Sequence, residues 1–97
     1  MHALLIAINS KYVHTALGLR YVGEYAKAQG FAVNLIEETI NTPILTVLEK
    51  IMDCKAEVYA FSVHIWNKPF VFRLISMLKK LRPEAIIVIG GPEVAFD

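Results

Sequence analysis

Three polar segments of this 97-residue chain carry the side chains that could do chemistry, and each follows directly on an apolar run. They are Asn9–Thr15, Ser62–Asn67 and Gly90–Glu93. Together they supply amide, hydroxyl and imidazole groups for hydrogen bonds, a tryptophan for stacking, and paired glycines at which a backbone can approach a ligand closely. Every strand-to-helix loop needs polar turn residues and helix caps, so each segment taken alone also has a purely structural explanation.

Several well-known chemistries are excluded by residues that these segments lack. Asn9–Thr15 contains no glycine, which excludes a dinucleotide-binding G-x-G-x-x-G turn, and the chain has no G-K-[ST] sequence of a P-loop. No acidic residue follows the first or third apolar run, so a phosphoacceptor carboxylate is not available. His14 and His64 have no further ligand at metal-binding spacing, and we predict no metal site. The single cysteine, Cys54, excludes an internal disulfide and is expected to be a small core residue.

Four apolar runs typical of buried parallel strands alternate with three amphipathic helix patterns. This alternation predicts an α/β fold, a doubly wound parallel sheet of order 2-1-3-4. Right-handed crossovers then place the first helix on one face and the other two helices on the opposite face. The three polar segments meet at the carboxyl edge of such a sheet, where ligands bind. The expected strands are 3–8, 31–36, 58–63 and 85–89; the expected helices are 16–29, 43–54 and 69–82, with Thr42 capping the second helix and Asn67 or Lys68 the third.

The composition is that of one small domain whose sheet is covered on both faces. Apolar residues make up 56% of the chain, yet no apolar run reaches the roughly 18–20 residues of a membrane span. The first residues contain no basic segment of a secretory signal. The basic residues are scattered and the net charge is +1. This net charge favours no class of partner. The lack of a secretory signal and the single cysteine lead us to expect a cytoplasmic protein, and we expect neither nucleic acid nor a membrane as partner.

The fourth apolar run, Ala85–Ile89, is typical of a strand covered on both faces and paired on both edges. Pro92–Val94 then begins another helix pattern, and the sequence ends at Asp97. We therefore interpret residues 1–97 as a single, incomplete domain that is truncated before a fifth strand. Natural proteins blunt an exposed edge with charges or cover it, so we expect self-association through the open edge of strand four.

Three motifs occur in order along the chain: K-Y-V-H-T-A-L-G-L-R-Y-V at Lys11–Val22, F-S-V-H-I-W-N at Phe61–Asn67 and I-G-G-P-E-V at Ile89–Val94. In this combination the chain resembles the N-terminal cobalamin-binding domain of cobalamin-dependent radical SAM proteins, of the kind similar to magnesium-protoporphyrin IX monomethyl ester cyclase. The resemblance implies a flavodoxin-like (Rossmann-like) sheet that holds cobalamin (vitamin B12) with its corrin ring at the carboxyl ends of the strands. Because an incomplete pocket buries less of a ligand, we expect residues 1–97 in isolation to bind cobalamin weakly or not at all. It also implies a C-terminal radical SAM domain as partner, which would bind S-adenosylmethionine and an iron–sulfur cluster in the full-length protein. This chain would then be a non-catalytic module of a methyltransferase- or cyclase-type enzyme.

The residues that the resemblance assigns to the cofactor come from all three polar segments, with Tyr12 and Trp66 as flat surfaces. One departure concerns the cobalt. Related cobalamin mutases and methyltransferases carry D-x-H-x-x-G, whose histidine binds the metal, whereas Tyr12 and Leu17 stand here in place of the aspartate and the glycine. We therefore predict that His14 does not ligate cobalt. The complete set of expected cofactor-binding residues is Asn9, Ser10, Lys11, Tyr12, His14, Thr15, Ser62, Val63, His64, Trp66, Asn67, Gly90, Gly91, Pro92 and Glu93.

Two alternatives remain open from the residues. The chain could be a cobalamin-free docking domain of a radical SAM protein, or a small flavodoxin-like regulatory or interaction domain. A C-x-x-x-C-x-x-C motif downstream would favour either radical SAM interpretation and would exclude the regulatory one.

Overall fold

The computed structural model describes residues 1–9 and 17–90 and, in the first helix, the side chains from Gly23 onward. Strands and helices alternate along the chain, as the apolar periodicity predicts. Among the described helices, none has the length and apolar character of a membrane span. The elements are β1 His2–Asn9, α1 Leu17–Ala28, β2 Ala32–Thr39, α2 Ile44–Asp53, β3 Val58–Ser62, α3 Lys68–Leu81 and β4 Ile86–Gly90.

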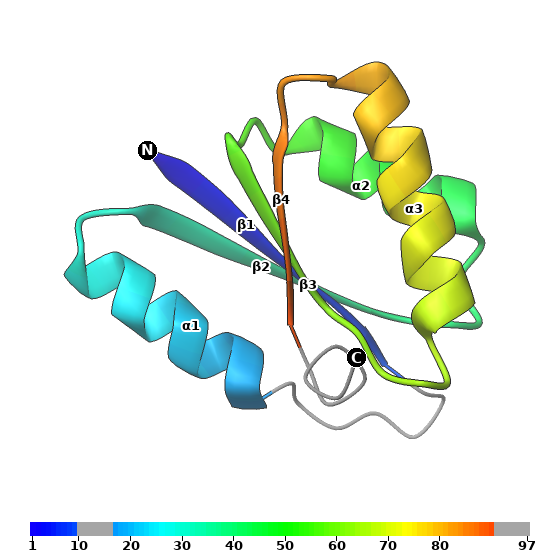
Figure 1. Ribbon diagram of the computed structural model, residues 1–97, viewed down its shortest axis with the longest axis horizontal. Helices are drawn as coiled ribbons and strands as arrows, with labels where there is room; N and C mark the ends of the chain where they lie inside the picture. Colours follow the sequence, from blue (N-terminus) through cyan, green and yellow to red (C-terminus); the bar gives the residue numbers. More distant parts are fainter. Residues whose placement is uncertain (10–16, 91–97) are drawn as a thin grey trace.

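The sheet has the order β2-β1-β3-β4, and each pair of neighbouring strands is parallel. Figure 1 shows α1 on one side of the sheet and α2 and α3 on the other. Both findings confirm the predicted doubly wound topology, in which the chain first winds one way from β1 and then the other way from β2 onward. The inner strands are β1 and β3, and the strand order reverses beside β1.

Side chains alternate between the two faces of each strand, so the sheet separates two apolar layers. The layer under α1 is small and consists of Leu5, Ala7 and Ala60, with Val33 packed against it. At Gly23 the helix comes so close that an added Cβ would lie 2.7 Å from Leu5 Cδ1. The larger layer lies under α2 and α3. It contains Leu4, Ile6, Ile8, Tyr59 and Phe61 from the sheet, Val63 from the residue after β3, and Val47, Leu48, Ile51, Val71, Leu74 and Leu78 from the helices.

Two predicted boundaries are wrong at the β2–α2 connection. The strand β2 continues to Thr39, past the expected end at Ile36, because an edge strand tolerates polar side chains that interrupt the apolar pattern. Thr42 does not cap α2. Its hydroxyl donates to Glu38 Oε1 at 3.2 Å instead, and Pro43 occupies the N-cap position without any side-chain hydrogen bond. The threonine is thus bonded back to the end of β2 rather than to the helix.

The edge strand β4 is exposed on the α1 side of the sheet, where Ile86 is 52% and Val88 is 47% exposed. The N–H of Ile86 donates to Glu57 O at 3.0 Å, so alternate residues of β4 pair with β3. The backbone groups of Ile87 and Ile89 then point away from β3, and no other strand in the described ranges pairs with them. Within those ranges, therefore, the outer edge of β4 is unpaired, and its side chains on the α1 face of the sheet are exposed.

Arg82 joins the ends of α2 and α3 on the opposite side of the sheet from α1. Its Nη2 donates to Met52 O at 2.8 Å, and its Nη1 donates to Cys54 O at 3.1 Å and to the hydroxyl of the buried Tyr59. Carbonyls at a helix C-terminus lack partners within the helix and carry partial negative charge, so a guanidinium is well suited to them. The contact fixes α2 and α3 to each other and to the core.

Candidate functional site

The carboxyl ends of β1, β3 and β4 lie at one edge of the sheet, near the bottom of Figure 1. Asn9 ends β1, Ser62 ends β3 and Gly90 ends β4. Ser62 and Gly90 are paired in register, and the N–H of Val63 donates to Gly90 O at 2.7 Å beyond them. The topology therefore brings the described parts of the three polar segments to a single edge.

Asn67 lies beneath this edge and is only 1% exposed. Its Nδ2 donates to Ile8 O at 2.9 Å and to Ser62 O at 3.2 Å, and its Oδ1 accepts the N–H of His64 at 2.7 Å. It occupies the N-cap position of α3, one of the two alternatives predicted, but its side chain makes no capping hydrogen bond. The amide instead ties the ends of two neighbouring strands to the loop that follows β3.

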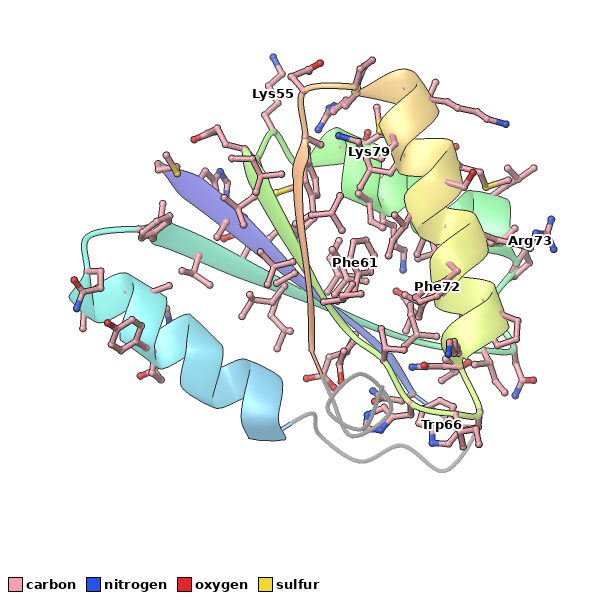
Figure 2. The ribbon with its side chains drawn as sticks, viewed as in Figure 1. Lys55, Phe61, Trp66, Phe72, Arg73 and Lys79 are labelled. Carbon is pink, nitrogen blue, oxygen red and sulfur yellow. The ribbon has the colours of Figure 1, made fainter. Side chains whose placement is uncertain are left out.

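His64 and Trp66 form a stacked pair in that loop, with ring centroids 5.2 Å apart and ring planes inclined by 2°. His64 Nε2 also lies 3.1 Å from Ser62 Oγ, a hydrogen-bond distance at which the tautomer decides which group donates. Trp66 remains 43% exposed, and Figure 2 shows it at the end of the molecule where the strands end. The neighbouring Ile65, which was not among the predicted residues, is 76% exposed. The signal for it in the sequence is an isoleucine beside Trp66 within a strand-to-helix loop.

Asn9 supplies a buried polar group at the same edge. The residue is 8% exposed, and its Nδ2 has no hydrogen-bond partner among the described residues. A buried donor without a partner costs about 1–3 kcal/mol, so such groups are rare unless something else satisfies them. A ligand carbonyl at this edge would do so.

Gly90 leaves space at the end of β4. An added Cβ would meet no atom of the described residues within 4 Å, and the φ of Gly90 lies outside the left-handed region. Neither packing nor backbone conformation therefore requires glycine at this position. Val63 differs from its predicted companions, because its side chain is fully buried in the core under α2 and α3 and its N–H is bonded to Gly90 O. Only its carbonyl could face a ligand.

The remaining predicted site residues lie outside the described ranges. They are Ser10, Lys11, Tyr12, His14, Thr15, Gly91, Pro92 and Glu93.

A hollow of about 760 Å³ opens between α2 and the β1–β2 side of the sheet, away from the carboxyl ends of the strands. Its lining includes Lys55, which Figure 2 shows at the opposite end of the molecule from Trp66. Cys54 lies in this hollow, with its Sγ 3.7 Å from Asn34 Nδ2 and 3.8 Å from His2 Nε2. The expectation that Cys54 is a core residue is therefore only partly correct, since the thiol is half-buried. Within the described ranges, no three His, Cys, Asp or Glu side chains are grouped to hold a metal.

Comparisons with known proteins identify the family and the fold of this chain. Residues 3–97 match the family model of the B12 binding domain. Among solved structures, the chain is similar to a novel cobalamin-binding protein from Desulfitobacterium hafniense DCB-2, with a TM-score of 0.72 and 20% sequence identity. That likeness covers 94% of this chain and 44% of the other, so this chain spans less than half of that protein's length. At such an identity it establishes the shared flavodoxin-like α/β fold. No curated protein matches the sequence.

Proposed function

Because the chain belongs to the B12-binding domain family, we propose that it holds a cobalamin at the carboxyl edge of its sheet, as the cofactor module of a radical SAM enzyme. The observation that carries the proposal is the stacked, partly exposed His64–Trp66 pair beside the hydroxyl of Ser62. A flat aromatic surface suits a corrin ring or a nucleotide base, and a hydroxyl beside it suits the amide groups at the corrin periphery.

Two further groups at this edge fit a large amide-bearing ligand. The unpartnered Nδ2 of Asn9 is a donor that a corrin amide carbonyl would satisfy. The open space at Gly90 allows a ligand to approach the backbone at the end of β4. Neither feature has a structural explanation within the described residues, so both support a ligand at this edge.

The residues of the chain would bind and orient the cofactor. Trp66 would provide the apolar contact, and Ser62 and Asn9 would provide hydrogen bonds whose geometry is set by the strands that end at them. When bound, cobalamin supplies a cobalt ion that can carry a methyl group or exchange electrons. In this proposal the chemistry of the enzyme belongs to another domain.

The radical SAM context rests on the sequence motifs at Lys11–Val22, Phe61–Asn67 and Ile89–Val94. In this proposal, S-adenosylmethionine and the iron–sulfur cluster bind to a separate radical SAM domain of the same protein. The chain has one cysteine, and such a cluster needs several thiolate ligands. The carboxyl edge would face that domain, so that a bound cofactor lies between the two.

The test is a titration of the protein with hydroxocobalamin, followed by the visible absorption of the corrin and by quenching of the single tryptophan. We expect weak but saturable binding, which Trp66→Ala weakens further by about tenfold, the loss of one good aromatic contact. Since that variant contains no tryptophan, its binding is followed by the corrin absorption alone. Flavin mononucleotide, the ligand of many sheets of this topology, is titrated in parallel and should not bind.

Phe72→Ala is the matched control, because Phe72 is 42% exposed and Trp66 is 43% exposed. Figure 2 shows Phe72 on the flank of α3, apart from the strand ends. Its removal should leave cobalamin binding unchanged. An unmutated protein that does not bind hydroxocobalamin would overturn the proposal in favour of a cobalamin-free docking domain. Equal effects of the two substitutions would show that binding occurs elsewhere on the surface.

A further inference from the structure

We propose that Asn67 is the positioning residue of the candidate site. Its side chain does not contact the ligand; it holds the backbone of His64, so that the His64–Trp66 pair is a preformed surface before any ligand binds. Only the expected effect of Asn67 on cobalamin affinity rests on the proposed function. The arrangement of the loop itself can be measured in the ligand-free protein.

The first argument is that the side chain of Asn67 does not make the capping hydrogen bond that is usual at an N-cap. An asparagine at an N-cap ordinarily accepts a backbone N–H from the first turn of its helix, which contributes about 0.5–2 kcal/mol. Here that bond is not made, although Asn67 is the N-cap residue of α3. Its Oδ1 accepts the N–H of His64 at 2.7 Å, three residues before it. The side chain therefore stabilises the loop instead of the helix.

The second argument is that the contacts need an amide of this length. The NH2 group donates to Ile8 O and to Ser62 O while the carbonyl accepts from His64. An aspartate of the same shape could accept but not donate, and it would place a negative charge against two carbonyl oxygens at a position that is 1% exposed. No hydrophobic residue could make any of the three bonds.

The third argument is the location of the residues that Asn67 holds. Ile8 immediately precedes Asn9, whose Nδ2 is the unpartnered donor of the site. Ser62 and His64 are the hydrogen-bonded pair beside Trp66. One buried amide thus connects the described candidates at the ends of β1 and β3. Fixing these groups in advance lowers the entropy lost when a ligand orders them.

The decisive experiment compares Asn67→Asp with the unmutated, ligand-free protein by nuclear magnetic resonance. A stacked indole shifts the ring protons of the imidazole beside it, and His64→Gln identifies these signals among the three histidines of the chain. We expect Asn67→Asp to remove at least half of that shift while the far-ultraviolet circular dichroism stays unchanged. It should also weaken hydroxocobalamin binding by about tenfold or more, since two side chains must then be ordered on binding.

Asn41→Asp is the control for added charge. Asn41 is exposed and lies just after the end of β2. The residue before it, Ile40, donates its N–H to Asn9 O, so a charge at position 41 also lies at the carboxyl edge of the sheet. It should alter neither the His64 shift nor the affinity. If both aspartate variants reduce affinity equally and the His64 shift persists in Asn67→Asp, the effect is one of charge and the inference is overturned.

A measurement on the unmutated protein covers the case in which Asn67→Asp fails to fold. The side-chain amide protons of Asn67 should exchange with solvent at least tenfold more slowly than those of the exposed Asn41. Equal exchange rates would overturn the inference, because a buried triple contact protects its protons. These two readouts require no ligand. Absence of cobalamin binding would therefore contradict the proposed function while leaving the role of Asn67 to be decided by the loop alone.

Discussion

At Gly23 the helix α1 packs closely against the sheet, and replacing this glycine by alanine sets two effects of known size against each other. Alanine is a better helix former than glycine by about 0.8–1.0 kcal/mol in a helix interior. Against this, the new Cβ would lie 2.7 Å from Leu5 Cδ1, a distance that real Cβ contacts do not show. Forcing an extra methyl group into a packed layer typically costs about 1–3 kcal/mol.

The details of the contact place the cost within that range. Only one atom is too close, since the next neighbour, Val33 Cγ1, is at an ordinary 3.7 Å. Leu5 is 3% exposed, however, so its methyl group has little free space into which it can turn. We take a packing cost of about 2 kcal/mol, in the middle of the range for overpacking, and subtract the gain in helix propensity of about 1 kcal/mol. Gly23→Ala should therefore lower the free energy of unfolding by about 1 kcal/mol.

Equilibrium urea denaturation of a double-mutant cycle tests this reasoning. Leu5→Val removes the δ-methyl groups, so in that background Gly23→Ala should become stabilising by roughly 0.5–1 kcal/mol, and the coupling energy should be about 1.5–2 kcal/mol. Ser76→Ala at an exposed position of α3 is the control for helix propensity alone and should not couple to Leu5→Val. If Gly23→Ala stabilises the protein equally in both backgrounds, α1 is free to move outward and the close approach does not determine its position.

Three other predictions depend on single contacts or motifs. Arg82→Lys replaces the two guanidinium nitrogens that bind Cys54 O and Met52 O by a single ammonium group. It should lower the free energy of unfolding by about 2 kcal/mol, because hydrogen bonds to charged groups contribute about 1.5–3 kcal/mol. Urea denaturation measures this, and a midpoint equal to that of the exposed control Arg73→Lys would contradict it. The open edge of β4 should pair with a second copy of the chain, so the mass in light scattering should rise with concentration and Val88→Lys should remain monomeric. A strictly monomeric unmutated protein at high micromolar concentration would refute that pairing. Finally, the Co(II) form of a cobalamin-loaded protein should show no axial nitrogen from His14, because Tyr12 stands where D-x-H-x-x-G has its carboxylate. Triplet splittings in electron paramagnetic resonance that vanish in His14→Ala would show the opposite.

The strand order and the placement of the helices could be predicted because they depend on long apolar runs and on the handedness of crossovers. The run at β1 is buried over its whole length from Ala3 to Asn9, as an inner strand requires. Its alternation with amphipathic helices then leaves few topologies open. The apolar pattern of each strand and helix extends over many residues, so a single polar residue within it does not change the predicted topology.

The boundaries of β2 and α2 could not be predicted, because they depend on single contacts. Glu38 lies on an edge strand, where its carboxylate accepts from Thr42 at 3.2 Å and from Lys50 Nζ at 2.5 Å. The hydrogen bond from Thr42 to Glu38 competes with the preference of threonine for an N-cap position. The sequence alone does not show which of these two interactions is more stable. Cys54 is a similar case, since its half-buried position depends on how far α2 covers the outer strand β2.

Asn67 shows why the candidate site is specified by topology as well as by residue type. Its amide bonds to Ile8 O across 59 positions of sequence, and the two meet only because β1 and β3 are neighbours in the sheet. In a sheet whose strands followed chain order, β2 would separate them, and the buried amide of Asn67 would lose one of its acceptors. The residue type sets how many hydrogen bonds are available, and the strand order β2-β1-β3-β4 sets where they are made. The same reversal of strand order that opens a crevice for ligands therefore also places the side chain that holds the loop beside it.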